Sequence, residues 1–223
     1  MGILKKLGNL VIISGFSGVG KGTVVQKLLE GSDHYALSIS MTTRKPRDNE
    51  EHGVHYYFVK DEEFEDMIAK NGFLEHAGYV GCYYGTPRAF VEEHRGKGID
   101  VILEIEVQGA LQVKKRHPEA IMIFITTPNA REMERRLTNR KMDSYAKITS
   151  RMERAIEEAE QMKKYDYVVI NDVLDDCVRT VEEIIVNEPS GPRYDPKFKD
   201  RFVESLKEII VERKNCTEFS ENR

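Results

Sequence analysis

A glycine-rich segment near the N-terminus contains the residue types that bind phosphate groups. Residues 15–23 read GFSGVGKGT; they follow an apolar run and precede valines and leucines at helical spacing. Glycines let successive backbone N–H groups face an anion, and the N-terminus of a following helix adds a positive dipole. Lys21 would supply a cation for the β- and γ-phosphates and, because Gly22 follows the lysine, Thr23 would offer the hydroxyl to Mg²⁺. The pattern predicts a nucleoside triphosphate site formed by Gly15, Phe16, Ser17, Gly18, Val19, Gly20, Lys21, Gly22 and Thr23.

A second group of residues could bind a second phosphorylated molecule. Arg44 and Arg47 follow the second predicted strand, and guanidinium groups can clamp a phosphate with paired hydrogen bonds. Tyr56 and Tyr84 could donate further hydrogen bonds. Glu75 could accept from both N1–H and the 2-amino group of guanine, whereas adenine would leave its charge unpaired. Each of these residues alone is more often a surface or packing residue, so the prediction depends on their occurrence together with the phosphate loop.

Short apolar runs that alternate with amphipathic stretches must position these side chains. This alternation predicts βαβ crossovers and therefore an α/β fold, with a central parallel sheet covered by helices on both faces. We expect strands at residues 9–14, 36–41, 100–105, 120–126 and 167–170, and helices at 24–30, 87–95, 128–140, 145–164 and 175–187.

Two regions depart from the alternation. Residues 41–86 predict a small mixed α/β insertion with its own sheet, which has a strand at 54–60, a helix at 61–70 and short strands within 73–84. After a Pro-Ser-Gly-Pro break at residues 189–192, the chain predicts a charged amphipathic helix at 197–214. We expect this C-terminal extension to be peripheral to the core.

Composition excludes several classes of protein. Of 223 residues, 40% are hydrophobic and 32% are charged, which excludes a fibrous or wholly disordered chain. The net charge of −4 argues against a general nucleic-acid or anionic-membrane binder, and no apolar run approaches the roughly 18 residues of a membrane span. Three widely spaced cysteines suit a reducing compartment. We therefore expect a soluble cytoplasmic protein that binds neither nucleic acid nor membranes; its oligomeric state, monomer or homo-oligomer, stays open.

Six segments resemble, in order, the motifs of the guanylate kinase family. They are residues 15–23, 40–47 (SMTTRKPR), 53–59 (GVHYYFV), 81–86 (GCYYGT), 103–109 (LEIEVQG) and 168–172 (VVIND). The resemblance implies a P-loop nucleotide kinase that phosphorylates GMP from ATP with Mg²⁺, and that also accepts dGMP. It implies a domain at residues 1–188, with a core at about 8–40, 87–130 and 162–188, a GMP-binding insertion at about 41–86 and a helical lid at about 131–161. The extension would occupy 189–223.

The resemblance also implies individual roles. The GMP phosphate would be held by Arg44, Arg47, Tyr56 and Tyr84, and guanine would be read by Ser40, Glu75 and Thr86. Glu104 would face the metal, through water, and the phosphates, while Glu106 would face the nucleoside. Asn171 would lie near the adenine of ATP. The catalytic group would be Lys21, Arg44, Arg136, Arg140 and Arg151, the last three brought over the phosphates by the lid.

Two departures from the family pattern affect these expectations. Glutamate stands at 104 and 106, where the family often has aspartate, and we expect both carboxylates on one face at the end of a buried strand. The family's Gly-Thr-acidic stretch after Arg140 is replaced by residues 141–144 (KMDS). The second departure puts turnover in more doubt than reaction type.

The predicted reaction is ATP + GMP ⇌ ADP + GDP, by in-line attack of a GMP phosphate oxygen on the γ-phosphorus. No general base is assigned, because the GMP phosphate is already a nucleophile.

Two alternatives to this function stay open. One is a kinase for another nucleoside monophosphate, such as AMP; Ser40, Glu75 and Thr86 argue against it. The other is a non-catalytic peptide-binding module, against which the intact phosphate loop and lid arginines argue.

Overall fold

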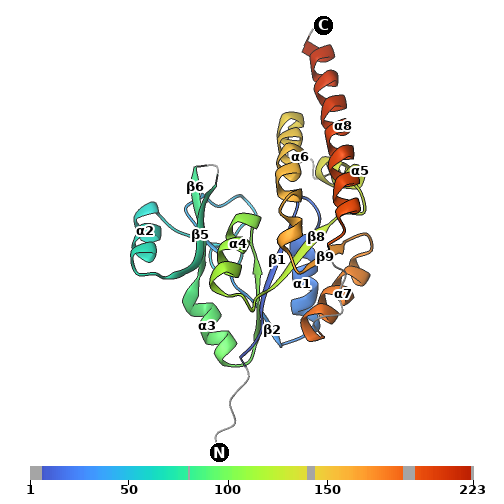
Figure 1. Cartoon of the computed structure of the whole chain (residues 1–223). Helices are drawn as coiled ribbons and strands as arrows, with labels where there is room; N and C mark the ends of the chain where they lie inside the picture. Colours follow the sequence, from blue (N-terminus) through green and yellow to red (C-terminus); the bar gives the residue numbers. More distant parts are fainter. Residues whose placement is uncertain (1–6, 80, 140–143, 188–193, 222–223) are drawn as a thin grey trace, which may run out of the picture. The chain divides into compact units, whose positions relative to one another are not determined.

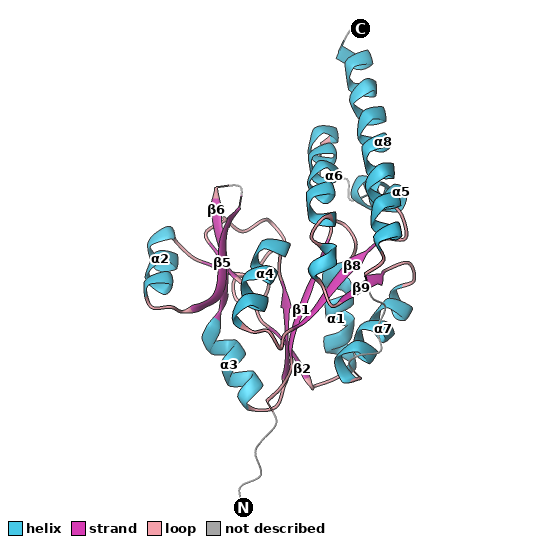
Figure 2. Ribbon diagram, in the orientation of Figure 1, coloured by secondary structure: helices cyan, strands magenta, loops and turns pink. Residues whose placement is uncertain are grey.

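The computed structural model describes residues 7–79, 81–139, 144–187 and 194–221. Its strands form two sheets (Figures 1 and 2), one ordered β2-β7-β1-β8-β9 and one ordered β4-β3-β6-β5. The first contains β1 (Leu10–Gly15), β2 (Tyr35–Leu37), β7 (Asp100–Glu104), β8 (Ile121–Thr126) and β9 (Tyr167–Ile170); the second contains β3 (Met41–Thr42), β4 (Tyr57–Phe58), β5 (Phe73–Tyr79) and β6 (Cys82–Pro87).

Helices follow most of these strands. They are α1 (Lys21–Gly31), α2 (Asp61–Ala69), α3 (Arg88–Gly96), α4 (Val107–Arg116), α5 (Ala130–Asn139), α6 (Tyr145–Ala159), α7 (Leu174–Val186) and α8 (Pro196–Glu221), with a 3-10 turn at Met162–Lys164. In the first sheet β1 and β2 pair in parallel with β7, and β8 pairs in parallel with β9. Strands β1 and β8 are buried along their whole length, as continuous apolar runs require in a parallel sheet. The predicted α/β fold with a central parallel sheet is confirmed.

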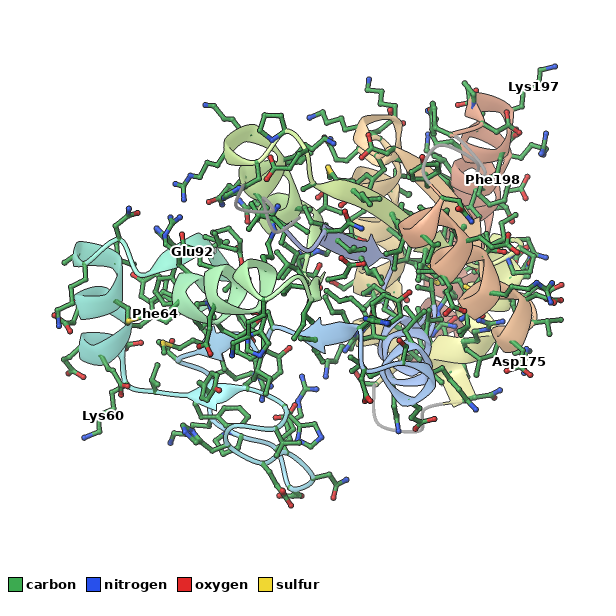
Figure 3. All side chains as sticks on the ribbon, turned by 90° about the horizontal axis from the view of Figure 1, so that it is seen from below. Lys60, Phe64, Glu92, Asp175, Lys197 and Phe198 are labelled. Atoms are coloured by element: carbon green, nitrogen blue, oxygen red, sulfur yellow. The ribbon has the colours of Figure 1, made fainter. Side chains whose placement is uncertain are left out.

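The described residues form two compact units, one of residues 7–14 and 25–122, the other of residues 15–24 and 123–221. In the first unit, the second sheet packs against α2. Phe64 of α2 is fully buried and stacks on Phe73 and Tyr83, at ring-centroid distances of 4.5 and 5.4 Å. Figure 3 shows Phe64 pointing from α2 toward the sheet, whereas Lys60, before the helix, points outward. This packing fixes the sheet that carries Glu75 and Tyr84.

In the second unit, α8 packs against the helices that the sequence predicts as a lid (Figure 1). Its apolar residues recur at helical spacing and are buried: Phe202, Val203, Leu206, Ile209 and Ile210. The expected helix is present. The expectation that the extension is peripheral is wrong, because its apolar face belongs to the core of this unit.

Several predicted elements differ from the observed ones. The strand predicted at 36–41 is two strands in different sheets, because Ser38 N bonds to Ile102 O of the first sheet while Tyr57 N bonds to Ser40 O of the second. The strand predicted at 54–60 is limited to β4. No helix was predicted at α4. Among the described residues no helix is both long and apolar enough to cross a bilayer.

Candidate active site

The phosphate loop lies between β1 and α1, and its residues belong to the second unit. Gly20 has φ +91°, and a Cβ there would lie 2.7 Å from Nδ2 of Asn171, so both backbone and space require glycine. Lys21 folds back over the loop and donates from Nζ to the carbonyl oxygens of Gly15 (2.8 Å) and Phe16 (3.0 Å). The ammonium group therefore lies at the loop, where the dipole of α1 also favours an anion.

Three other predicted residues contact this loop. Asn171, which follows β9, is buried and donates from Nδ2 to Val19 O at 2.8 Å. Arg136 of α5 donates to the same carbonyl at 3.4 Å, and Arg151 of α6 donates to the hydroxyl of Ser17. The second unit thus gathers two guanidinium groups and an ammonium group around a loop suited to polyphosphate. Arg140 lies outside the described residues, as do residues 141–143 of the altered lid stretch.

Arg136 is held in place by a carboxylate of its own helix. Its Nε donates to Oε1 of Glu132 at 2.6 Å, and Arg135 donates to both oxygens of the same carboxylate at 2.7 Å. Hydrogen bonds from Arg135 and then Arg136 lower the pKa of Glu132 to about 2. Glu132 therefore stays ionised over the whole physiological range and fixes the Arg136 side chain.

The arginines predicted to hold the GMP phosphate lie in the first unit and share one carboxylate. Arg44 donates from its two terminal nitrogens to the two oxygens of Glu50, each at 2.9 Å. Arg47 donates its backbone N–H to Glu50 at 2.9 Å, and its guanidinium lies 3.9 Å from the other oxygen. Hydrogen bonding from Arg44 lowers the pKa of Glu50, and the same bond raises that of Arg44. The site therefore already accommodates an anionic group of oxygen acceptors.

The predicted tyrosines surround Arg44. Its guanidinium carbon lies 5.4 Å from the centroid of Tyr56, and Tyr56 meets Tyr84 edge to face at 6.1 Å. A hydrogen bond with Tyr84 also contributes to the raised pKa of Arg44. Thr42 holds the segment that carries Arg44 against β6. Its hydroxyl donates to Tyr83 O at 2.8 Å and accepts from Arg44 N at 3.2 Å.

Glu75 is buried on strand β5 of the first unit. Strands β5 and β6 pair it with Thr86, whose hydroxyl donates to Oε1 at 2.6 Å. The Glu75 side chain is 4% exposed, and burial raises the pKa of its carboxyl group, an effect that the Thr86 hydroxyl opposes. A Cβ at Gly109 would lie 2.5 Å from Oε2, so the glycine leaves room for this oxygen. The two oxygens of Glu75 are acceptors suited to a ligand that presents adjacent N–H donors.

Three further predicted residues, Ser40, Glu104 and Glu106, lie in or beside the strands of the first unit. Ser40 precedes β3 and is half-buried. Glu104 ends β7, and its charge is the second cause, after burial, of the raised pKa of Tyr56. Glu106 was expected on the same strand face, but β7 ends at Glu104 and Glu106 is the exposed N-cap of α4. That expectation is wrong because the chain turns into a helix before a second strand position is reached.

Comparison with known proteins identifies the family. A guanylate kinase family model matches residues 7–188. The chain is 50% identical over 182 residues to a guanylate kinase of Latilactobacillus sakei, covering 81% of this chain and 90% of that one, and 44% identical over 208 residues to one of Lactococcus lactis, covering 93% and 100%. The chain belongs to the guanylate kinase family. The crystal structure of guanylate kinase from Anaplasma phagocytophilum superposes with a TM-score of 0.68 at 31% identity, covering 84% of this chain and 89% of that chain.

Within this guanylate kinase fold, two residues at the site were not predicted. Glu50 accepts hydrogen bonds from Arg44 and Arg47. Because a glutamate three positions after an arginine is common on protein surfaces, the sequence alone offers no reason to select it. Gly109 lies within α4, a helix that was not predicted, so its close approach to Glu75 could not be expected from the sequence. Thr23 is exposed in the first turn of α1. Among the described residues, no group of three or more His, Cys, Asp or Glu side chains could hold a metal ion.

Proposed function

We propose that the protein transfers the γ-phosphate of ATP to GMP, giving ADP and GDP, as a step of purine nucleotide metabolism, and that it also accepts dGMP. The observation that carries this proposal is the buried carboxylate of Glu75, held by the Thr86 hydroxyl in a guanylate kinase family member that also retains its phosphate loop. An acceptor pocket and a donor loop in one chain support phosphoryl transfer rather than binding alone.

On the donor side, the loop N–H groups and Lys21 would bind the ATP phosphates, and Asn171 would lie near adenine. Arg136 and Arg151, which contact Val19 and Ser17, would stabilise the charge that develops on the transferred group. The same role is proposed for Arg140. The contacts of Arg136 and Arg151 with the loop support their assignment, because a phosphate bound at the loop would lie within their reach.

On the acceptor side, Arg44, Arg47, Tyr56 and Tyr84 would bind the GMP phosphate, which takes the place of Glu50 as their anionic partner. Glu75 and Thr86, with Ser40, would read guanine, and Glu106 would face the nucleoside. Adenine has no donor at N1 and no 2-amino group, so AMP would leave the buried Glu75 carboxylate without partners.

The reacting groups are supplied by the substrates. A GMP phosphate oxygen attacks the γ-phosphorus in line and ADP leaves, so the protein's part is positioning and charge stabilisation. Mg²⁺ bound to ATP neutralises phosphate charge when present. The exposed Thr23 hydroxyl, a hard oxygen ligand at the start of α1, fits this ion, and Glu104 would contact its water shell.

We further propose that residues 1–188 form the kinase domain, with the GMP-binding insertion at about 41–86 and the lid at about 131–161. The proposed location is the cytoplasm. The thiols of Cys82 and Cys177 are free, which suits a reducing compartment.

The direct test is ADP release from ATP with GMP or AMP as acceptor. We expect turnover with GMP and at least a hundredfold lower kcat/KM with AMP. Faster turnover with AMP would contradict the guanine assignment, and no turnover with either would favour a binding module.

A second experiment tests the donor site. Lys21→Ala should lower kcat at least a hundredfold, because it removes the cation at the loop. Lys27→Ala is the matched control, because Lys27 lies exposed on the same helix. Unchanged GMP phosphorylation by Lys21→Ala would show that the donor site is wrongly assigned.

A further inference from the structure

Helix α8 lies beyond the family match, yet it contacts the phosphate loop. The family model ends at residue 188, whereas α8 is Pro196–Glu221. Phe202 of α8 stacks on the fully buried Phe16 of the loop, with ring centroids 5.0 Å apart and an interplanar angle of 14°. Helix α8 supports the phosphate loop and also packs against α5 and α6. It can therefore fix the position of these two helices relative to the loop.

Arg213 of α8 joins α5 to α6. Its side chain is 8% exposed. The guanidinium donates to Oε1 of Glu134 on α5 at 2.9 Å and to the hydroxyl of Thr149 on α6 at 3.2 Å. It also lies over the ring of Tyr145 on α6, with its carbon 3.8 Å from the centroid. A planar group with five donors can serve two helices at once, which a lysine ammonium on a flexible stem does poorly.

Two residues that contact Arg213, one on each helix, lie two positions before the arginines that contact the phosphate loop. On α5, Glu134 precedes Arg136; on α6, Thr149 precedes Arg151. Two positions along an α-helix amount to a rotation of about 200°. Arg213 and the phosphate loop therefore contact opposite sides of both helices. A fixed contact on one side sets the rotation and height of the arginine on the other.

Other contacts of α8 with these helices are more exposed. Arg131 pairs with Glu212 at 2.8 Å, and Lys214 pairs with Glu153 at 2.5 Å, but all four side chains are about half exposed. Ion pairs of this kind contribute little. The Arg213 guanidinium is buried, and the Thr149 hydroxyl that accepts from it donates to the Tyr145 carbonyl at 3.1 Å. Glu134, its partner on α5, is 20% exposed and also pairs with Arg131 at 3.4 Å.

We propose that Arg213 is a positioning residue for phosphoryl transfer, which holds α5 and α6 so that Arg136 and Arg151 stay directed at the phosphate loop. The proposal rests on the proposed function, since that function gives these two arginines their catalytic role. The GMP-binding residues lie in the first unit, so the expected effect is on kcat and on binding of the donor, not on the KM for GMP.

The first test compares Arg213→Met with Arg213→Lys and Arg179→Met. Arg179 is an exposed arginine of α7, paired with Asp176 at 2.6 Å, and is the matched control. We expect Arg213→Met to lower kcat about tenfold with the KM for GMP within twofold of the parent, Arg213→Lys to recover only part of the loss, and Arg179→Met to behave as the parent. A kcat within twofold of the parent for Arg213→Met would overturn the proposal.

The second test separates positioning from lost stability. Val181→Ala removes buried methyl groups from α7 and serves as a destabilised control. If Arg213 acts through Arg151, then Arg213→Met should lower kcat much less in an Arg151→Met background than in the parent. Equal losses in both backgrounds, or a similar kcat loss in Val181→Ala, would overturn the proposal. If Arg213→Met does not fold, Glu134→Gln and Thr149→Val each remove one hydrogen-bond partner of Arg213. A kcat equal to that of the parent in both variants would overturn the proposal.

A binding measurement keeps this proposal distinct from the proposed function. Titration with a fluorescent ADP analogue, without GMP, reports the donor site alone. If the parent protein transfers no phosphate to GMP, the proposed function fails. An ADP-analogue Kd raised about three- to tenfold in Arg213→Met, but not in Arg179→Met, would still support the positioning role of Arg213, and equal Kd values would contradict it.

Discussion

At the scale of single residues, the Glu75 carboxyl group combines burial with a recognition role. Burial raises its pKa, so the unliganded group keeps its proton at a higher pH than an exposed glutamate does. Guanine donors favour the ionised form. GMP binding should therefore release a proton, and GMP affinity should fall as the pH falls through the raised pKa.

This prediction can be measured by titration calorimetry in two buffers of different ionisation enthalpy. The GMP phosphate itself titrates near about pH 6, so the comparison is with Glu75→Gln, in which only the phosphate contributes. We expect Glu75→Gln to bind GMP at least tenfold more weakly and with less proton release. Identical proton release in the two proteins would contradict the loss of a proton from Glu75 on GMP binding.

Gly109 gives a second prediction at this scale. A methyl group at Gly109 would meet the Glu75 carboxylate, whose far end can move, rather than backbone. Gly109→Ala should therefore leave folding almost unchanged but raise the KM for GMP about tenfold, with little effect on the KM for ATP. Gly96→Ala is the control, because Gly96 ends α3 with nothing within 4 Å of the added Cβ. Equal KM values for GMP in both variants would show that the carboxylate position does not matter.

At the scale of elements, the sequence predicts buried strands well and changes of sheet poorly. Strands β1, β7 and β8 are apolar throughout their centres, and this composition alone identifies them. Alternation from Leu37 to Met41 continues across the point where the chain leaves one sheet for the other. A local pattern reports which residues are buried but not the strand against which they pair, so this break could not be predicted.

The helices show the same limit. Helix α4 was missed because Gly109 and a basic end obscure the spacing of Val107, Ala110 and Val113, which are buried. The apolar face of α8 was visible in the sequence, but its partners are α5, α6 and, for Phe202, the loop residue Phe16, all far from it in the chain. The role of Arg213 depends on such distant contacts, to Thr149 and Glu134. The contacts of Glu50 are local, but a charged residue has the same appearance in a sequence whether its side chain is solvated or bridges two others.

Helix α5 offers a prediction about acid stability. The pKa of Glu132 is lowered from 4.5 to about 2, so its ion pairs with Arg135 and Arg136 contribute stability that is present above pH 4.5 and is lost as the pH falls toward 2. Glu132→Gln should lower the free energy of unfolding by less than about 1 kcal/mol at pH 7, because the pairs lie near the helix surface. The difference between the two proteins should shrink between pH 4.5 and 2. A constant difference across this range, measured by denaturant unfolding, would contradict the shift.

At the scale of the whole molecule, the proposed substrates divide between the two units. The residues proposed for GMP, from Ser40 to Glu106, belong to the first unit, and the phosphate loop with α5 and α6 belongs to the second. Ligand binding stabilises the contacts that it completes. Amide hydrogen exchange of the full chain should therefore show GMP slowing exchange in β3, β5 and β6, and ADP with Mg²⁺ slowing it in residues 15–23, α5 and α6.

The control for this experiment is Glu75→Gln with GMP and Lys21→Ala with ADP. Each variant should lose protection by its own nucleotide and keep protection by the other, because the altered residues lie in different units. Protection of β5 and β6 by ADP alone, or of the phosphate loop by GMP alone, would contradict the division. Such a result would mean that a nucleotide binds outside the pocket to which its chemistry assigns it, and both the Glu75 and the Lys21 assignments would have to be revised together.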